Sequence, residues 1–161
     1  MKATIQAKMQ ATKQSWRTYW ALNHAERAIA RSAALELTAT WIGLRLFGFG
    51  RWKQIITRRT ETSEPRRTAL SANRILQLQA AAARNLFFHA NCLEQSLVLW
   101  MLLRRHGFAA DLKIGARKEA GRFEAHAWVE LNQVRLNDQP DSDPKFVPFD
   151  RAISSLETQP E

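Results

Sequence analysis

The sequence contains a single cysteine, Cys92, among its 161 residues, so no intramolecular disulfide can form. At its beginning there is no basic stretch followed by an apolar run, and therefore no secretory signal is expected. Both features favour a cytoplasmic protein. Uncharged runs such as 37–44 and 95–103 are far shorter than the roughly 20 residues of a membrane-spanning helix, so membrane association is not expected.

Two kinds of ligand chemistry also lack their sequence signals. There is no G-x-x-x-x-G-K loop that could hold the phosphates of ATP. One cysteine and no close pair of histidines argue against a zinc site. We therefore expect neither a cofactor nor a metal.

Acidic residues are scarce in the first part of the chain. Residues 1–91 hold 15 Lys and Arg against 4 Asp and Glu, a net charge of +11, whereas residues 92–161 hold 9 against 11, a net charge of −2. This excess is typical of a region that meets an acidic partner, although arginines on the solvated faces of helices would give the same count. A nucleic-acid partner is not expected, because the arginines are scattered among apolar positions and are not clustered in one recognition helix.

Residues 1–67 read as a helical N-terminal region. Asn23 and Glu26 have the spacing of a capping box that opens a helix. That helix should stop at Gly48 and Gly50, and a short amphipathic piece over Arg51–Arg59 should follow. The region closes with a polar, proline-containing linker or exposed loop over Thr60–Arg67.

A second region, residues 68–153, has the pattern of a compact core. Ser71 or Asn73 starts a helix that runs to about Phe88. Asn91 and Glu94 then form another capping box, which opens a helix that is apolar on nearly every side and should therefore be buried.

Beyond Gly107 the apolar residues alternate with polar ones, which is typical of strands. Strands are expected from about 110 to 114, from 123 to 131 and from 134 to 137, followed by a poorly ordered tail over 154–161. Helices followed by an antiparallel sheet define an α+β fold, in which the central buried helix carrying Cys92 packs on the sheet.

Two residues of this core could carry chemistry. Cys92 lies in the first turn of the buried helix, where the helix dipole stabilises a thiolate, although a lone cysteine is more often a small buried hydrophobe. His126 lies in the middle of a strand and shares a face with Trp128. If that face packs on the central helix, His126 points at the helix; otherwise it is an ordinary histidine of a sheet.

Asp138, which follows the third strand, is a candidate for orienting the His126 imidazole. A hairpin loop of residues 131–133 would place Asp138 directly opposite His126 on the same face. A two-residue loop at Asn132-Gln133 would instead place it opposite Ala127, with its side chain on the wrong face. Asn132-Gln133 itself reads as a tight turn, so the role of Asp138 requires the longer loop or a bulge.

Asp141 and Asp143 are alternatives to Asp138, but they follow Pro140 in an irregular stretch. The chain order of cysteine at a helix start, histidine on a strand and aspartate after the next strand is the order of papain-like and transglutaminase-like folds.

Residues 91–138 resemble the leader peptidase of bacterial lasso-peptide biosynthesis. In that family a Cys-Leu opens a Leu-rich helix with an Arg-rich end, and an Ala-His-Ala-Trp-Val-Glu strand and an Asp follow. The family's common proline before Cys-Leu is absent here, where Phe88-His89-Ala90 stands. The matching positions are Cys92, Leu93, Arg104, Arg105, Gly107, Leu112, Ile114, Gly115, Ala125 to Glu130 and Asp138.

The resemblance implies a standalone, transglutaminase-like cysteine protease that removes the leader from a ribosomally made precursor peptide. Cys92 would be the nucleophile, His126 the acid–base partner and Asp138 the orienting residue. The backbone N–H of Cys92 would stabilise the oxyanion, and Asn91 or Gln95 could supply a second donor or be ordinary helix residues. The implied partners are the precursor peptide, a separate leader-recognition protein and an ATP-dependent cyclase.

Two other interpretations stay open: another transglutaminase-like amidase, and a non-catalytic scaffold of a peptide-maturation complex.

Overall fold

The computed structural model describes residues 19–61, 68–119, 122–137 and 146–148. Several predictions concern residues outside these ranges, namely most of the linker predicted over Thr60–Arg67, the residues Asp138, Asp141 and Asp143, and the tail over 154–161. The first two linker residues, Thr60 and Glu61, belong to a helix instead.

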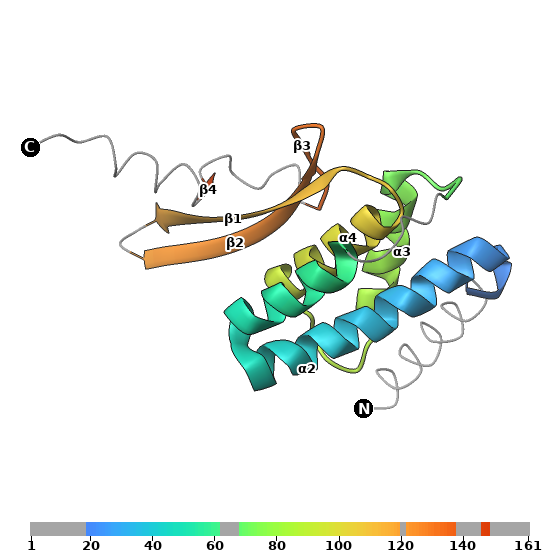
Figure 1. Ribbon diagram of the computed structural model, residues 1–161, viewed down its shortest axis with the longest axis horizontal. Helices are drawn as coiled ribbons and strands as arrows, with labels where there is room; N and C mark the ends of the chain where they lie inside the picture. The colour runs from blue at the N-terminus through green and yellow to red at the C-terminus, as the bar shows by residue number, and fades with distance from the viewer. Residues whose placement is uncertain (1–18, 62–67, 120–121, 138–145, 149–161) are drawn as a thin grey trace, which may run out of the picture.

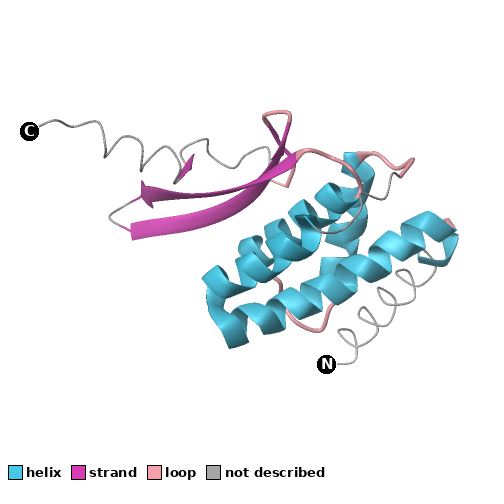
Figure 2. Ribbon diagram, viewed as in Figure 1, coloured by secondary structure: helices cyan, strands magenta, loops and turns pink. Residues whose placement is uncertain are grey.

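Within these ranges the fold is α+β, as predicted (Figure 1). Three helices come first and lie on one side of an antiparallel sheet whose strand order is β3-β2-β1-β4 (Figure 2). The elements are α2 (His24–Glu61), α3 (Ala72–Arg84), α4 (Cys92–Arg105), β1 (Ala110–Glu119), β2 (Arg122–Leu131), β3 (Val134–Arg135) and β4 (Val147–Pro148).

Helix α2 starts at the predicted capping box. The Asn23 side chain accepts from the Glu26 N–H at 2.9 Å, and the Asn23 N–H donates to the Glu26 carboxylate at 3.0 Å. At Gly48 the backbone has the non-helical values φ 72° and ψ 171°, so the first segment of α2 ends there as predicted, and a second helical segment continues to Glu61. No helix in the described ranges is long and apolar enough to cross a membrane.

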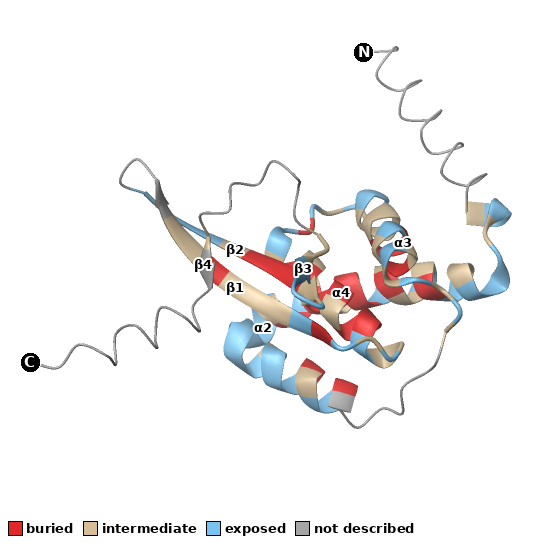
Figure 3. Cartoon of the chain, turned by 90° about the horizontal axis from the view of Figure 1, so that it is seen from above, coloured by how far each residue is buried: buried red, intermediate tan, exposed pale blue. Residues whose placement is uncertain are grey.

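Helix α4 lies at the centre of the core, as its apolar pattern predicts (Figure 3). Its buried side chains contact all the neighbouring elements, and each contributes about 1.5–3 kcal/mol of hydrophobic stabilisation. Val98, Leu99, Leu102 and Leu103 pack with Ile29 and Leu37 of α2, Ile75 and Leu78 of α3, and Ala110 and Val129 of the sheet, while Leu97 and Met101 pack with Ile56.

Strands β1 and β2 pair along their whole length, with Gly115 opposite His126 and Leu112 opposite Val129. Val129 and Ala110 belong to the core around α4, so the face of the sheet that carries their side chains packs against the helices. Because side chains alternate along a strand, Trp128 lies on the opposite face.

The β2–β3 hairpin has the shorter of the two loops considered above. Leu131 pairs with Val134, and the turn residues Asn132 and Gln133 have φ values of 51° and 66°. Two consecutive left-handed residues are typical of a type I′ turn, whose twist matches that of the flanking strands. The tight turn predicted at Asn132-Gln133 is therefore confirmed, and the three-residue loop that the triad hypothesis required is absent.

Strand β3 is also shorter than predicted, because the ladder ends at its second residue. The Leu136 N–H still donates to the Val129 carbonyl at 2.9 Å, but the Val129 N–H donates to the side chain of Asn137 at 2.8 Å. The chain thus leaves the ladder before Asp138, and strand alternation no longer determines on which face Asp138 lies.

Candidate active site

Cys92 is the first residue of α4, and its side chain is exposed. The prediction of a buried helix is confirmed, but the cysteine itself is not buried, because it precedes the turn at which α4 enters the core. An exposed thiol at a helix N-terminus is accessible to a substrate and lies at the positive end of the helix dipole.

The backbone on both sides of Cys92 is held by hydrogen bonds. The Asn91 side chain accepts from the Glu94 N–H at 2.9 Å, and the Asn91 N–H donates to the Glu94 carboxylate at 2.8 Å, which confirms the predicted capping box. The Gln95 amide donates to the Ala90 carbonyl at 2.7 Å. The side chains of Asn91 and Gln95 therefore both help to hold the start of the helix.

Arg45 of α2 joins this helix start, and sequence reasoning missed it. Its guanidinium donates to the second carboxylate oxygen of Glu94 at 3.1 Å. The Glu94 side chain is only 2% exposed, so Arg45 supplies the counter-charge that a buried carboxylate requires. No local spacing could have revealed this contact, because the two residues are 49 positions apart.

An aromatic cluster leads into the same helix start. Trp41 stacks on Phe88 with ring centroids 4.8 Å apart, and the Arg45 guanidinium lies 4.1 Å from the Trp41 ring centroid. Phe87 contacts both rings, yet 86% of it is exposed. An apolar surface is therefore present a few residues before Cys92.

Ser96 fixes the position of α4 relative to β2. Its hydroxyl donates to the Ala127 carbonyl at 2.8 Å and accepts from the Asn137 amide at 2.8 Å. Cys92 precedes Ser96 by four residues, so it lies on the same side of α4, one turn earlier.

Helix α4 and strand β2 run in the same direction (Figure 1). One helical turn advances by about 5–6 Å, roughly the length of two strand residues. Since Ser96 is bonded at Ala127, the start of α4 lies at the level of Ala125 and His126.

His126 lies on the face of the sheet that α4 does not cover. Its ring is half-buried, with its centroid 6.1 Å from Trp128 and 5.1 Å from Phe146. The Arg135 guanidinium lies 4.2 Å from the centroid of the Trp128 ring, and the Trp128 indole N–H donates to Glu130 at 2.7 Å.

The sheet therefore does not pack on α4 through the face of Trp128, which was the condition for His126 to point directly at the helix. The opposite face packs there because Ala127 and Val129 are small enough for α4 to come close. Cys92 and His126 thus lie at the same height on adjacent elements, but the imidazole is on the face of β2 that points away from α4. Asp138 lies outside the described residues.

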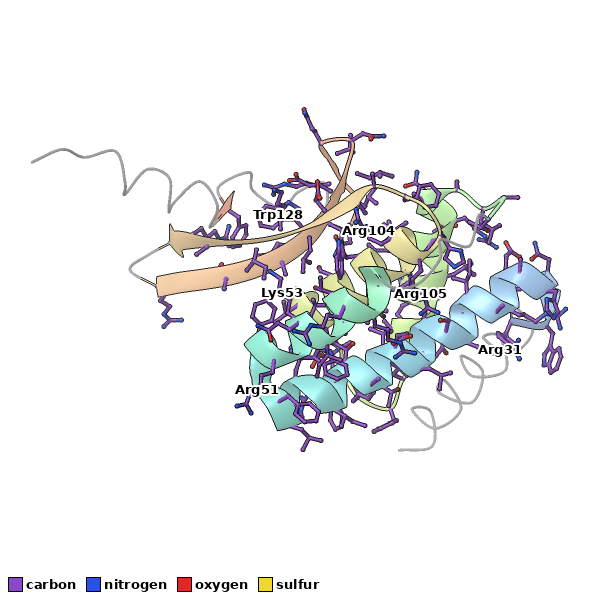
Figure 4. All side chains as sticks on the ribbon, viewed as in Figure 1. Arg31, Arg51, Lys53, Arg104, Arg105 and Trp128 are labelled. Carbon is purple, nitrogen blue, oxygen red and sulfur yellow. The ribbon has the colours of Figure 1, made fainter. Side chains whose placement is uncertain are left out.

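Charged residues elsewhere on the helices are partly paired. Arg105 of α4 donates to Glu36 of α2 at 3.0 Å (Figure 4), and Arg74 of α3 donates to Glu26 at 2.7 Å.

Among the described residues, no three His, Cys, Asp or Glu side chains converge as metal ligands.

A family model described as the transglutaminase-like superfamily matches residues 34–150, which include Cys92, His126 and Asp138. The match covers well over half of the chain, so the protein belongs to the transglutaminase-like superfamily. Comparisons with curated proteins and with solved structures gave no match.

Proposed function

We propose that this protein is a cysteine peptidase that removes the leader from a lasso-peptide precursor. The observation that carries the proposal is the position of Cys92: an exposed thiol at the capped start of α4, level with His126, within the region that matches the superfamily. The leader-peptidase role rests on the resemblance of residues 91–138 to that family.

In the proposed mechanism the Cys92 thiolate attacks the carbonyl carbon of the scissile peptide bond. The Cys92 N–H, which is free at the first position of the helix, donates to the oxyanion. His126 gives a proton to the leaving amine, which departs as the N-terminus of the core peptide. Water then hydrolyses the thioester and releases the leader with a free carboxylate.

In this mechanism the His126 imidazole must reach the Cys92 thiol past the outer edge of β2, because the two side chains start on different sides of the sheet. Strand β3 pairs only with Glu130 and Leu131, so within the described residues no strand covers this edge at His126. In this proposal Asp138, the residue after Asn137, orients the His126 imidazole.

The partners in this proposal are the precursor, a separate leader-recognition protein and the cyclase that takes the product. Exposed cations on α2 are candidates for electrostatic attraction of an acidic partner. Arg51 and Lys53, on the second segment of α2, are exposed and form no ion pair with another described residue (Figure 4).

The proposal predicts a small precursor gene and a recognition-protein gene beside this one, and the test is reconstitution with that precursor peptide, with and without that recognition protein. Mass spectrometry should show a single cut between leader and core, faster with the recognition protein, and no cut by Cys92→Ala protein of unchanged fold. Thiol-dependent hydrolysis of unrelated amides, with the precursor left intact, would replace the leader peptidase by another transglutaminase-like amidase.

A further inference from the structure

The Arg45 side chain is 53% exposed, but its guanidinium has contacts besides the ion pair with Glu94. The Arg45 guanidinium donates to the carbonyl of Trp41 at 2.9 Å as well as to Glu94, and it lies against the Trp41 ring. Trp41 is in turn held by stacking on Phe88. These contacts orient the Arg45 guanidinium toward Glu94.

Glu94 places a negative charge in the same turn of α4 as the proposed nucleophile. A carboxylate is the best acceptor for the Asn91 N–H, and it suits a helix N-terminus. The same charge opposes a thiolate at Cys92, because like charges within one turn repel each other. An unpaired Glu94 would therefore cancel part of the benefit that the helix dipole gives to the thiolate.

We propose that Arg45 is a positioning residue whose charge compensates Glu94, so that the carboxylate holds the Asn91–Cys92 turn without opposing the thiolate. This inference rests on the proposed function, in which Cys92 reacts as a thiolate. It adds to that function a residue from a different helix, which acts on Cys92 only through Glu94.

The experiment is the pH dependence of iodoacetamide alkylation, which reports on Cys92 alone because the chain has one cysteine. Arg45→Met should move the midpoint of the profile to higher pH by about 0.5 to 1 unit, the effect of one uncompensated charge nearby. Glu94→Gln, which keeps a side-chain oxygen for the Asn91 N–H, should move it to lower pH. Shifts of opposite sign are not expected from loosened packing.

Three further variants sharpen the result. Arg45→Lys should restore most of the wild-type profile because it keeps the charge, and Arg45→Met combined with Glu94→Gln should lie close to wild type. Arg74→Met, which breaks the matching ion pair with Glu26 at the start of α2, should leave the profile unchanged. Circular dichroism and the unfolding midpoint of each variant establish that it is folded.

Equal profiles for folded Arg45→Met, Glu94→Gln and wild-type proteins would overturn the inference, and so would a shift of the same sign for both variants. Either result would leave the proposed function intact if precursor cleavage still requires Cys92. Conversely, precursor cleavage by folded Cys92→Ala protein would remove the proposed function whatever the alkylation profiles show.

Several other charged or titratable groups lie on the elements around this helix start and are the same in every variant, so they do not affect the comparison. They are His89 in the preceding loop, Lys53 on α2, Arg84 on α3, and Arg122, Glu124 and His126 on β2.

Discussion

Helices α2 and α4 begin in the same way, and comparing the two starts separates structure from chemistry. Each opens with an asparagine whose side chain and N–H exchange hydrogen bonds with the glutamate three residues on. Each glutamate also binds an arginine from another helix, Arg74 for Glu26 at 2.7 Å and Arg45 for Glu94 at 3.1 Å. The cap with its ion pair is therefore a general way to begin a helix here.

The two starts differ in what surrounds the cap. The residue after the asparagine is His24 in α2 and Cys92 in α4. The Glu26 side chain is 13% exposed, while that of Glu94 is 2% exposed. Only α4 lies beside β2, which carries His126. The reacting groups must therefore come from the residue after the asparagine and from the neighbouring strand, and the cap holds the first of them in place.

The largest expected difference comes from changing the first helical residue. Cys92→Ala should lower precursor cleavage by at least about a thousandfold, because it removes the nucleophile. His24→Ala, at the same position of α2, should leave cleavage unchanged. Initial rates under identical conditions measure both effects, and a similar loss for the two variants would show that Cys92 matters only for the helix start.

His126→Ala tests whether the strand beside α4 supplies the second catalytic group. Cleavage should fall by a factor comparable to that for Cys92→Ala, since members of a triad act as a unit. The free energy of unfolding should fall by only about 1 kcal/mol, the usual contribution of an aromatic contact. Kinetics and urea denaturation on the same preparation measure both, and undiminished cleavage would exclude His126 from the mechanism.

The two glutamates should contribute differently to stability. Glu94→Ala should lower the free energy of unfolding by about 2 kcal/mol, because it removes the cap and leaves the partly buried Asn91 N–H without its acceptor. Glu26→Ala should have a smaller effect, since water can replace the lost contacts at that exposed start. Equal losses in urea denaturation would mean that burial of the cap has no energetic importance.

The smallest expected effect is a pH dependence at the start of α2. The hydrogen bond from Arg74, followed by that from the Asn23 backbone, holds the pKa of Glu26 below its ordinary value. The resulting stabilisation is complete above the pKa of the unfolded chain and is lost as the pH falls through the lower pKa of the folded state. Glu26→Gln should therefore reduce the stability difference between about pH 7 and about pH 3. An unchanged difference would contradict this assignment.

The helix starts could be predicted because their hydrogen bonds are local. Asn91 with Glu94, like Asn23 with Glu26, needs only a spacing of three residues, and Ser71 caps α3 in the same local way by accepting from Arg74. The burial of α4 could be predicted for a similar reason, because a helix that is apolar all round has few alternatives.

The geometry around His126 could not be predicted in this way. The face of β2 that packs against α4 depends on how closely the helix can approach the strand. The small side chains of Ala127 and Val129 allow a close approach on their face. The hairpin loop was also ambiguous, since Asn132-Gln133 lacks the glycine that usually marks a type I′ turn. Arg45 depends on the long-range packing of α2 against α4.

Titration of the thiol tests the central claim, that Cys92 is the nucleophile, most directly. Because the chain has one cysteine, iodoacetamide can be added to the folded protein until each chain carries one adduct, with the adduct counted by intact mass. Residual cleavage of the precursor should fall in proportion to the alkylated fraction and reach zero at one adduct per chain. Fully alkylated protein that still cleaves the precursor at the wild-type rate would contradict the account.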